Sequence, residues 1–202
     1  MPIDFFVAPC SKIDGNCKKP GIICKNLLSD EEFGISDSNA NNRKPAFVDL
    51  SNEELWDIII ENPNRKEITF KAIDFCIEIF RIGNYLLDDE NRDPQNFLVE
   101  ETDRLDNGPI KRCECFLLFD KKILFIELKK RKRGNWLKDA REKFEETILS
   151  FKQSHPNTDY ILLDPIVSNK LHTGLHQNEM VQKRILKDKT GLDFHYKTSI
   201  TI

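Results

Sequence analysis

Lys111-Arg-Cys-Glu-Cys-Phe-Leu-Leu-Phe-Asp-Lys-Lys-Ile-Leu-Phe-Ile-Glu-Leu-Lys129 is the stretch of sequence that decides the fold. It contains two short apolar runs, 111–119 and 122–129, separated by the polar pair Asp120-Lys121. Two such runs with a two-residue polar break are typical of an antiparallel β-hairpin. The sequence therefore predicts two central strands joined by a tight turn.

The charged residues of this hairpin are expected to converge. Side chains alternate along a strand, so Glu127 and Lys129 should project from one face. Glu114 lies on the first strand, and the hairpin should fold it back to the level of Glu127. Its neighbours Cys113 and Cys115 should share one side of that strand. Two carboxylates and a lysine at one point predict a site for Mg²⁺ or Mn²⁺, with Lys129 orienting an attacking water.

Apolar periodicity predicts further elements after the hairpin. Trp136, Ala140, Phe144 and Ile148 recur every four residues and indicate a long amphipathic helix. Three more elements are expected: a strand at 160–163, a helix at 178–189 with Met180, Ile185 and Leu186 facing inward and Thr190-Gly191 as its stop, and a strand at 194–202.

Two helices are expected before the hairpin. Ser51 and Glu54 form a capping-box pattern, which predicts a short helix that ends near residue 62. An apolar stripe at three- and four-residue spacing predicts a second helix over 69–87. Asp74 and Glu78 lie four apart on it, either on a solvated face or, alternatively, beside a metal site.

The expected fold is α/β, with helices flanking a mixed central β-sheet and an irregular or helical segment at the N-terminus. We expect an acidic N-terminal segment with a short helix at 1–66 and an α/β core domain at 67–202. The apolar and charged fractions, 39% and 32%, are those of a folded globular chain.

Charge is divided unevenly along the chain. Residues 1–107 contain 12 lysines and arginines against 22 acids, whereas residues 108–202 contain 19 against 12. The basic half is therefore the part expected to contact a polyanion, and the acidic half is expected to shield it or to contact another protein. Lys129-Lys-Arg-Lys-Arg133 adds a basic run beside the proposed metal, where Lys130, Arg131, Lys132 and Arg133 could grip backbone phosphates.

The beginning of the chain and its cysteines favour a reducing compartment. The residues from Met1 to Pro9 lack the pattern of a secretory signal, so neither export nor membrane insertion is expected, and the cytoplasm is the expected location. The six cysteines are interpreted as reduced, small apolar side chains. The alternative is a zinc site at Cys10, Cys17 and Cys24.

The order of an acid, a Glu-x-Lys strand and an amphipathic helix resembles the PD-(D/E)xK nuclease superfamily. Here the pattern reads Glu114, then Glu127-Leu128-Lys129, then the helix from Trp136, and the likeness extends over residues 70–202. The resemblance implies a restriction-endonuclease-like fold and hydrolysis of nucleic acid, DNA in the first place, with Mg²⁺ or Mn²⁺. Defence, repair and mobile-element biology are the settings it suggests.

The resemblance also implies roles for single residues. Glu114 and Glu127 would be metal ligands and Lys129 the water-orienting group. The first acid of the family is normally Asp rather than Glu, so Asp106 is a rival for that position. Relatives present a Gln or Lys from the helix toward the substrate, for which Lys143 and Gln153 are the candidates.

A second hypothesis keeps the fold but not the chemistry. A nuclease-fold protein that has lost catalysis could act as a regulatory or immunity-type partner, and its acidic N-terminal half would then bind another protein. A homodimer stays open under both hypotheses.

Overall fold

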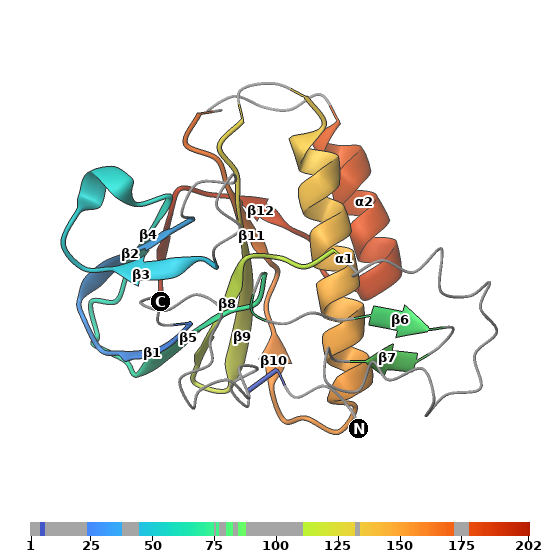
Figure 1. The fold of residues 1–202 in the computed structure, drawn as a ribbon, viewed down its shortest axis with the longest axis horizontal. Coiled ribbons are helices and arrows are strands. Elements are labelled where there is room, and N and C mark those ends of the chain that lie inside the picture. Colours follow the sequence, from blue (N-terminus) through green and yellow to red (C-terminus); the bar gives the residue numbers. More distant parts are fainter. Residues whose placement is uncertain are drawn as a thin grey trace.

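The computed structural model describes residues 5–6, 24–37, 45–74, 76, 80–82, 85–87, 111–131, 134–171 and 178–202. Within these ranges the chain forms a central seven-stranded sheet, a four-stranded sheet, a two-stranded hairpin and two α-helices (Figure 1).

The central sheet is mixed. Its strands, in spatial order, are β1 (Lys25–Leu28), β5 (Ile68–Ala72), β8 (Cys115–Phe119), β9 (Lys122–Leu128), β11 (Ile166–Ser168) and β12 (His195–Tyr196), and β10 (Ile161–Leu162) also pairs with β9. Neighbours from β1 to β9 run antiparallel. Strands β10 and β11 run parallel to β9, and β12 runs parallel to β11.

The β8–β9 hairpin is confirmed at the predicted position. Phe119 pairs with Lys122, which leaves Asp120 and Lys121 as a two-residue turn with φ angles of 48° and 59°. Two successive left-handed residues make the type I′ turn, whose twist matches that of paired strands. Neither residue is glycine, so the turn holds two side chains in a backbone region that favours glycine.

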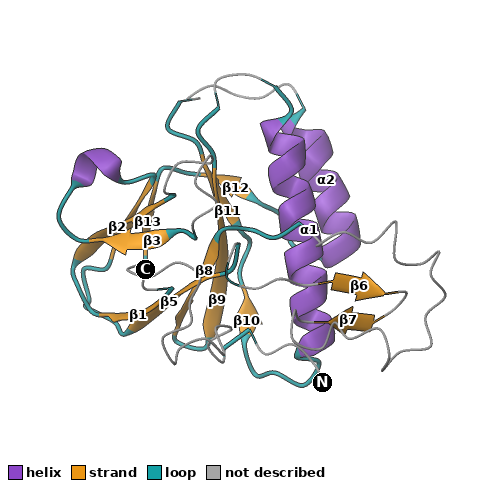
Figure 2. Cartoon of the chain, viewed as in Figure 1, coloured by secondary structure: helices purple, strands orange, loops and turns teal. Residues whose placement is uncertain are grey.

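Two α-helices cover one face of the central sheet (Figure 2). Helix α1 (Trp136–Ser154) packs Phe144, Ile148 and Phe151 onto a core that includes Phe116 and Phe125 of the hairpin. Helix α2 (Glu179–Thr190) ends at a left-handed Gly191, as expected from the sequence. Among the described residues, no helix has the length and apolar character needed to cross a membrane.

A second sheet covers the opposite face of the central sheet. Its spatial order is β13 (Ser199–Thr201), β4 (Ile58–Glu61), β2 (Glu32–Ser36) and β3 (Phe47–Asp49). Phe33, Ile58 and Ile60 of this sheet share a core with Phe70 and Ile126 of the central sheet. The molecule is therefore layered as helices, sheet, sheet, and the predicted α/β class with a helix-flanked mixed sheet is confirmed.

Strands from both sides of residue 66 take part in both large sheets. Strand β1 pairs with β5 in the central sheet, and the C-terminal β13 pairs with β4 in the second sheet. Backbone hydrogen bonds thus join the segment 1–66 to the segment 67–202 at two separate places.

The helix predicted from residue 51 to about 62 is wrong. The structure has a single 3₁₀ turn, Glu53–Leu55, followed by β4. No side chain caps this turn, and the Asp49 carboxylate instead accepts hydrogen bonds from the backbone amides of Ser51 and Asn52 just before it. Alternating burial, with Ile58 and Ile60 buried and Ile59 partly exposed, shows that the apolar run has the period of a strand.

The helix predicted over 69–87 is also wrong. Residues 68–72 form β5, which is hydrogen-bonded on both sides, and β6 (Phe80–Ile82) pairs with β7 (Tyr85–Leu87). Ile68, Phe70 and Ala72 alternate into the core between the sheets. That two-residue period overrides the three- and four-residue spacing seen in the sequence, because β5 lies between two partner strands.

Three further expectations need correction. Cys113 and Cys115 lie in different cores, the first under the helices and the second between the sheets, because β8 begins only at Cys115 and the chain bends before it. Met180 points outward and is 84% exposed. The terminal strand at 194–202 is divided, with β12 in the central sheet and β13 in the second sheet.

We predict that Lys121→Gly raises the free energy of unfolding by about 0.5–1 kcal/mol, because glycine adopts the left-handed turn without a Cβ clash. Urea denaturation measures the change. The matched control is Lys122→Gly, one residue later in β9, which should lower stability by about 0.5–1 kcal/mol. A less stable Lys121→Gly variant would contradict the turn assignment.

Candidate active site

Three carboxylates meet at one end of the central sheet, where the end of β5, the start of β8 and the end of β9 come together. Asp74 follows β5, Glu114 precedes β8, and Glu127 is the penultimate residue of β9. Their exposures are 8%, 4% and 0%. The antiparallel order β5-β8-β9 thus gathers three acids from distant parts of the sequence and removes them from water.

The backbone of Glu114 is hydrogen-bonded to the residues that carry the other two acids. Its carbonyl oxygen accepts hydrogen bonds from the amides of both Ile73, at 2.8 Å, and Asp74, at 3.3 Å. Its amide donates to Oε2 of Glu127 at 3.2 Å. One residue therefore holds the acid of β5 and the acid of β9 in register with each other.

Lys143 of α1 lies among the three acids. Its Nζ is 3.1 Å from Oδ2 of Asp74, 2.9 Å from Oε1 of Glu114 and 3.0 Å from Oε1 of Glu127. The Lys143 side chain is 15% exposed. A single ammonium is thus the common partner of carboxylates from three strand ends.

Lys129 is held between two acids. Its Nζ lies 2.7 Å from Oε1 of Glu127 and 2.5 Å from Oδ2 of Asp139. Asp139 belongs to the first turn of α1, so the helix fixes the lysine of the strand. Lys129 thus pairs with one acid of the cluster and with one acid of α1, and 8% of its side chain is exposed.

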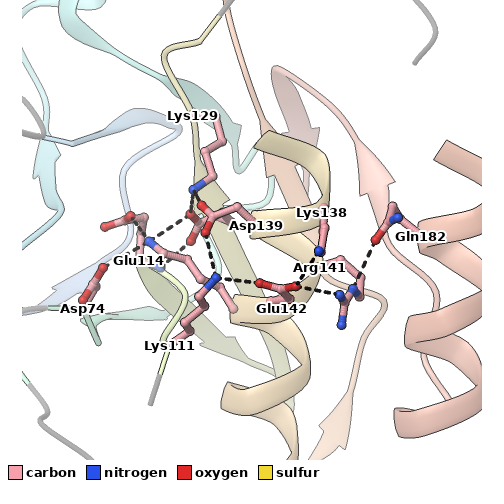
Figure 3. A network of polar contacts seen from close by, with 11 residues as sticks. Asp74, Lys111, Glu114, Lys129, Lys138, Asp139, Arg141, Glu142 and Gln182 are labelled. Atoms are coloured by element: carbon pink, nitrogen blue, oxygen red, sulfur yellow. Dashed lines mark hydrogen bonds and ion pairs between the residues drawn. The ribbon is translucent and has the colours of Figure 1, made fainter. Parts of the chain in front are cut away.

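The polar network continues along α1 and reaches α2 (Figure 3). Lys111 bridges Asp139, at 3.4 Å, and Glu142, at 2.5 Å. Arg141 contacts Glu142 at 3.0 Å and donates from Nε to Oε1 of Gln182 on α2 at 3.2 Å. Ion pairs and one hydrogen bond therefore connect the carboxylate cluster with the interface between the helices.

Burial and mutual repulsion shape the proton affinities of the cluster. Burial, followed by the neighbouring Glu127 carboxylate, raises the pKa of Glu114 well above its usual range. Burial alone would lower the pKa of Lys143, but the carboxylates of Glu127, Glu114 and Asp74 outweigh it and raise that pKa. The pKa of Lys129 is raised against the same burial effect, by Glu127 and Asp139. Both lysines therefore stay charged at neutral pH.

Arg112 adds a further cation beside Asp74. Its Nη2 lies 3.3 Å from Oδ1 of Asp74, and the residue is 8% exposed. Its Nε and Nη1 are buried and find no hydrogen-bond partner in the described part of the chain. Asp74 is thus held from one side by Arg112 and from the other by Lys143.

Residues next to strands of the second sheet also lie near this end of the central sheet. Lys130 follows Lys129 and places its Nζ 2.9 Å from Oδ2 of Asp57 and 2.8 Å from the carbonyl oxygen of Asp37. Asp37 follows β2 and Asp57 precedes β4. Burial raises the pKa of Asp37, and Lys130 counteracts this. Lys130 therefore ties the second sheet to the exit of β9.

The structure brings together five of the residues singled out in the sequence: Asp74, Glu114, Glu127, Lys129 and Lys143. Lys130 lies beside them but is engaged with Asp57, and the side chain of Arg131 is exposed. Gln153 is ten residues beyond Lys143 on α1, about 15 Å along the helix axis, and so is not brought to the site. Asp106, Lys132 and Arg133 lie outside the described residues, as do Cys10 and Cys17 of the alternative zinc site.

Sequence reasoning missed Asp139 and the acids of the second sheet. Asp139 reads as a residue that complements the dipole of a helix start, and nothing marks it as a partner of Lys129. Asp57 had a visible signal, since it interrupts the apolar stretch between Trp56 and Ile58. Asp37 lies in a polar stretch and has no such signal.

The residues of the cluster offer oxygen ligands to a divalent cation. Across the described ranges, no three acidic, histidine or cysteine side chains are preassembled as a metal cage. In the cluster the Lys143 ammonium stands between the acids. Oε2 of Glu114 is buried and accepts no hydrogen bond from any described residue. Mg²⁺ and Mn²⁺ prefer oxygen ligands such as carboxylates. The three acids of the cluster therefore have the ligand type that these ions need, and one oxygen of Glu114 is not engaged by any described residue.

Comparison of the chain with protein-family models, with curated proteins and with solved structures finds no match.

We predict that Glu114→Gln stabilises the fold increasingly as pH rises. Near pH 4 the wild-type Glu114 is protonated in both the folded and unfolded states, so the neutral variant should differ little. As pH rises, the unfolded chain releases this proton at a lower pH than the folded chain does, and over that interval the wild type loses stability relative to the variant. Each unit of pKa displacement is worth at most about 1.4 kcal/mol.

Urea denaturation at pH 4, 6 and 8, with chelator present, measures the difference in free energy of unfolding. A difference between Glu114→Gln and wild type that does not change with pH would contradict the raised pKa. Glu146→Gln, at a partly exposed position on α1, is the matched Glu-to-Gln control outside the cluster.

Proposed function

We propose that this protein is a divalent-metal-dependent nuclease that hydrolyses phosphodiester bonds, with DNA as the first substrate to test. The observation that carries the proposal is the convergence of Asp74, Glu114 and Glu127 on one ammonium position, with Lys129 2.7 Å from Glu127. The order of acid, Glu-x-Lys strand and amphipathic helix, which resembles the PD-(D/E)xK superfamily, supports it.

Glu114, Glu127 and Asp74 are the residues that would hold Mg²⁺ or Mn²⁺. When bound, such an ion lowers the pKa of a water molecule and offsets charge on a phosphate. Asp74 joins the two acids expected from the sequence, because the end of β5 is hydrogen-bonded to Glu114.

Lys129 would orient the attacking water and balance negative charge in the transition state. Its ammonium is positively charged, fixed by Glu127 and Asp139, and lies at the rim of the cluster. Asp139 is then a positioning residue, because it acts on the reaction through Lys129. The basic residues after Lys129, with exposed Arg131 among them, would bind backbone phosphates.

We predict metal-dependent cleavage of plasmid or single-stranded DNA that falls by about 100-fold or more in Glu127→Gln and in Lys129→Met. These variants remove a proposed ligand and the water-orienting charge while they preserve side-chain size. A gel assay with Mg²⁺ or Mn²⁺ measures the rates, and thermal unfolding checks that each variant is folded. Arg65→Ala is the control, since Arg65 lies next to Lys66, which pairs with Asp120 at the opposite end of the hairpin.

Cleavage that survives both substitutions, or that persists in chelator, would exclude this site as the catalytic centre. RNA substrates tested in parallel decide between the two nucleic acids.

We also predict that Arg131→Ala weakens DNA binding similarly for unrelated sequences and lowers the slope of log K against log salt by about 1. Fluorescence anisotropy between 50 and 200 mM salt measures this slope. The same control, Arg65→Ala, should leave the slope unchanged. A loss of affinity confined to one DNA sequence would argue for base reading instead of phosphate contact.

A second candidate is a nuclease-fold protein that binds a partner and has lost catalysis. It is favoured by the self-neutralised state of the cluster, in which Lys143 occupies the space among the acids. Failure of the wild-type chain to bind Mn²⁺ or to cleave any nucleic acid would favour this candidate.

A further inference from the structure

Lys143 has a position that the proposed chemistry does not explain. A substrate-binding lysine would be expected at the surface, facing the phosphate. Instead its Nζ lies within 2.9–3.1 Å of oxygens from Asp74, Glu114 and Glu127, the same groups that would hold a divalent ion. The ammonium and the ion would therefore compete for the same oxygens.

The charges around the cluster explain why the ammonium is there. Asp74, Glu114 and Glu127 are each more than nine-tenths buried, and repulsion between like charges is strong where water is excluded. The neighbouring cations are partly engaged elsewhere, since Lys129 also pairs with Asp139. Among the described cations, Lys143 is the one whose ammonium contacts all three acids.

Two carboxylate oxygens of the cluster are not fully engaged by the described residues. Oε2 of Glu114 is buried and has no hydrogen-bond partner among the described residues. Oε1 of Glu127 meets Lys129 and Lys143 as ion pairs without well-aligned hydrogen bonds. The lysine ammonium groups therefore leave part of the hydrogen-bonding capacity of the carboxylate oxygens unused.

We propose that Lys143 is a built-in counter-ion that a divalent cation displaces from the Asp74–Glu114–Glu127 carboxylates. This inference rests on the proposed function for the identity of the metal-holding residues. Displacement is physically accessible, because Lys143 has a long flexible side chain on α1 that is 15% exposed. Removal of the ammonium should then make metal binding tighter, whereas loss of an ordinary structural ion pair would make it weaker or leave it unchanged.

Binding of Mn²⁺ to the full chain tests the proposal. The free ion is measured by electron paramagnetic resonance for wild type, Lys143→Gln, Glu127→Gln and the control Lys138→Gln. Lys138 lies on the same helix, is 57% exposed and pairs only distantly with Glu142, at 3.8 Å. Lys143→Gln should bind Mn²⁺ about tenfold more tightly or better, Lys138→Gln like wild type, and Glu127→Gln much more weakly.

The outcomes separate this proposal from the proposed function. Equal or weaker Mn²⁺ binding by a folded Lys143→Gln variant, with wild-type binding intact, overturns the counter-ion role and leaves the nuclease proposal standing. Absence of Mn²⁺ binding in wild type and in both lysine variants overturns both.

A second measurement on wild type covers the case in which Lys143→Gln does not fold. Trace acetylation of lysines, read by mass spectrometry, should proceed slowly at Lys143 in chelator and at least severalfold faster in saturating Mn²⁺, because displacement frees the amine. Acetylation of Lys138 should be the same in both conditions. Unchanged reactivity of Lys143 in a sample that binds Mn²⁺ would overturn the proposal.

Discussion

Burial of charge at one end of a covered sheet is the constraint on which this structure depends. Helices cover one face of the β8–β9 hairpin and a second sheet covers the other, so the side chains at the open end of β9 are almost removed from water. A buried carboxylate is costly unless it is paired. The carboxylates at this end of the sheet are paired in this way: Glu127 pairs with Lys129 and Lys143, and Asp74 pairs with Arg112 and Lys143. Structural stability and proposed chemistry therefore use the same residues.

The hairpin, α1 and α2 were predicted correctly because their signals are local. A two-residue polar break, a four-residue apolar repeat and a Thr-Gly stop each determine an element without distant partners. The segments 51–62 and 69–87 were predicted wrongly because their strands depend on partners far away in the sequence. Strand β5 lies between β1 and β8, and β4 lies between β2 and β13, so tertiary pairing overrides the local pattern.

The candidate site was partly predictable for the same reason. Glu127 and Lys129 follow from alternation along one strand, and Glu114 from the turn that returns the chain. Asp74 was expected on a helix, and its place beside Glu114 depends on the pairing of β5 with β8. The pairing of Asp139 with Lys129 and the central position of Lys143 depend on how α1 packs across the end of the sheet. No sequence pattern determines that packing. The sequence thus predicts the acids of the hairpin together with Lys129, and the packing of α1 adds Lys143 as their shared counter-charge.

The route of the last residues has a consequence for how the chain folds. His195–Tyr196 completes the central sheet, and Ser199–Thr201 then closes the second sheet against β4, with Ser199 hydrogen-bonded to Glu61, 138 positions earlier. Contacts of such high order form late and slowly. During synthesis, the edge of β4 would stay open until nearly the whole described chain has emerged from the ribosome. An unpaired strand edge of this kind is a site at which a nascent chain can pair with another chain and aggregate.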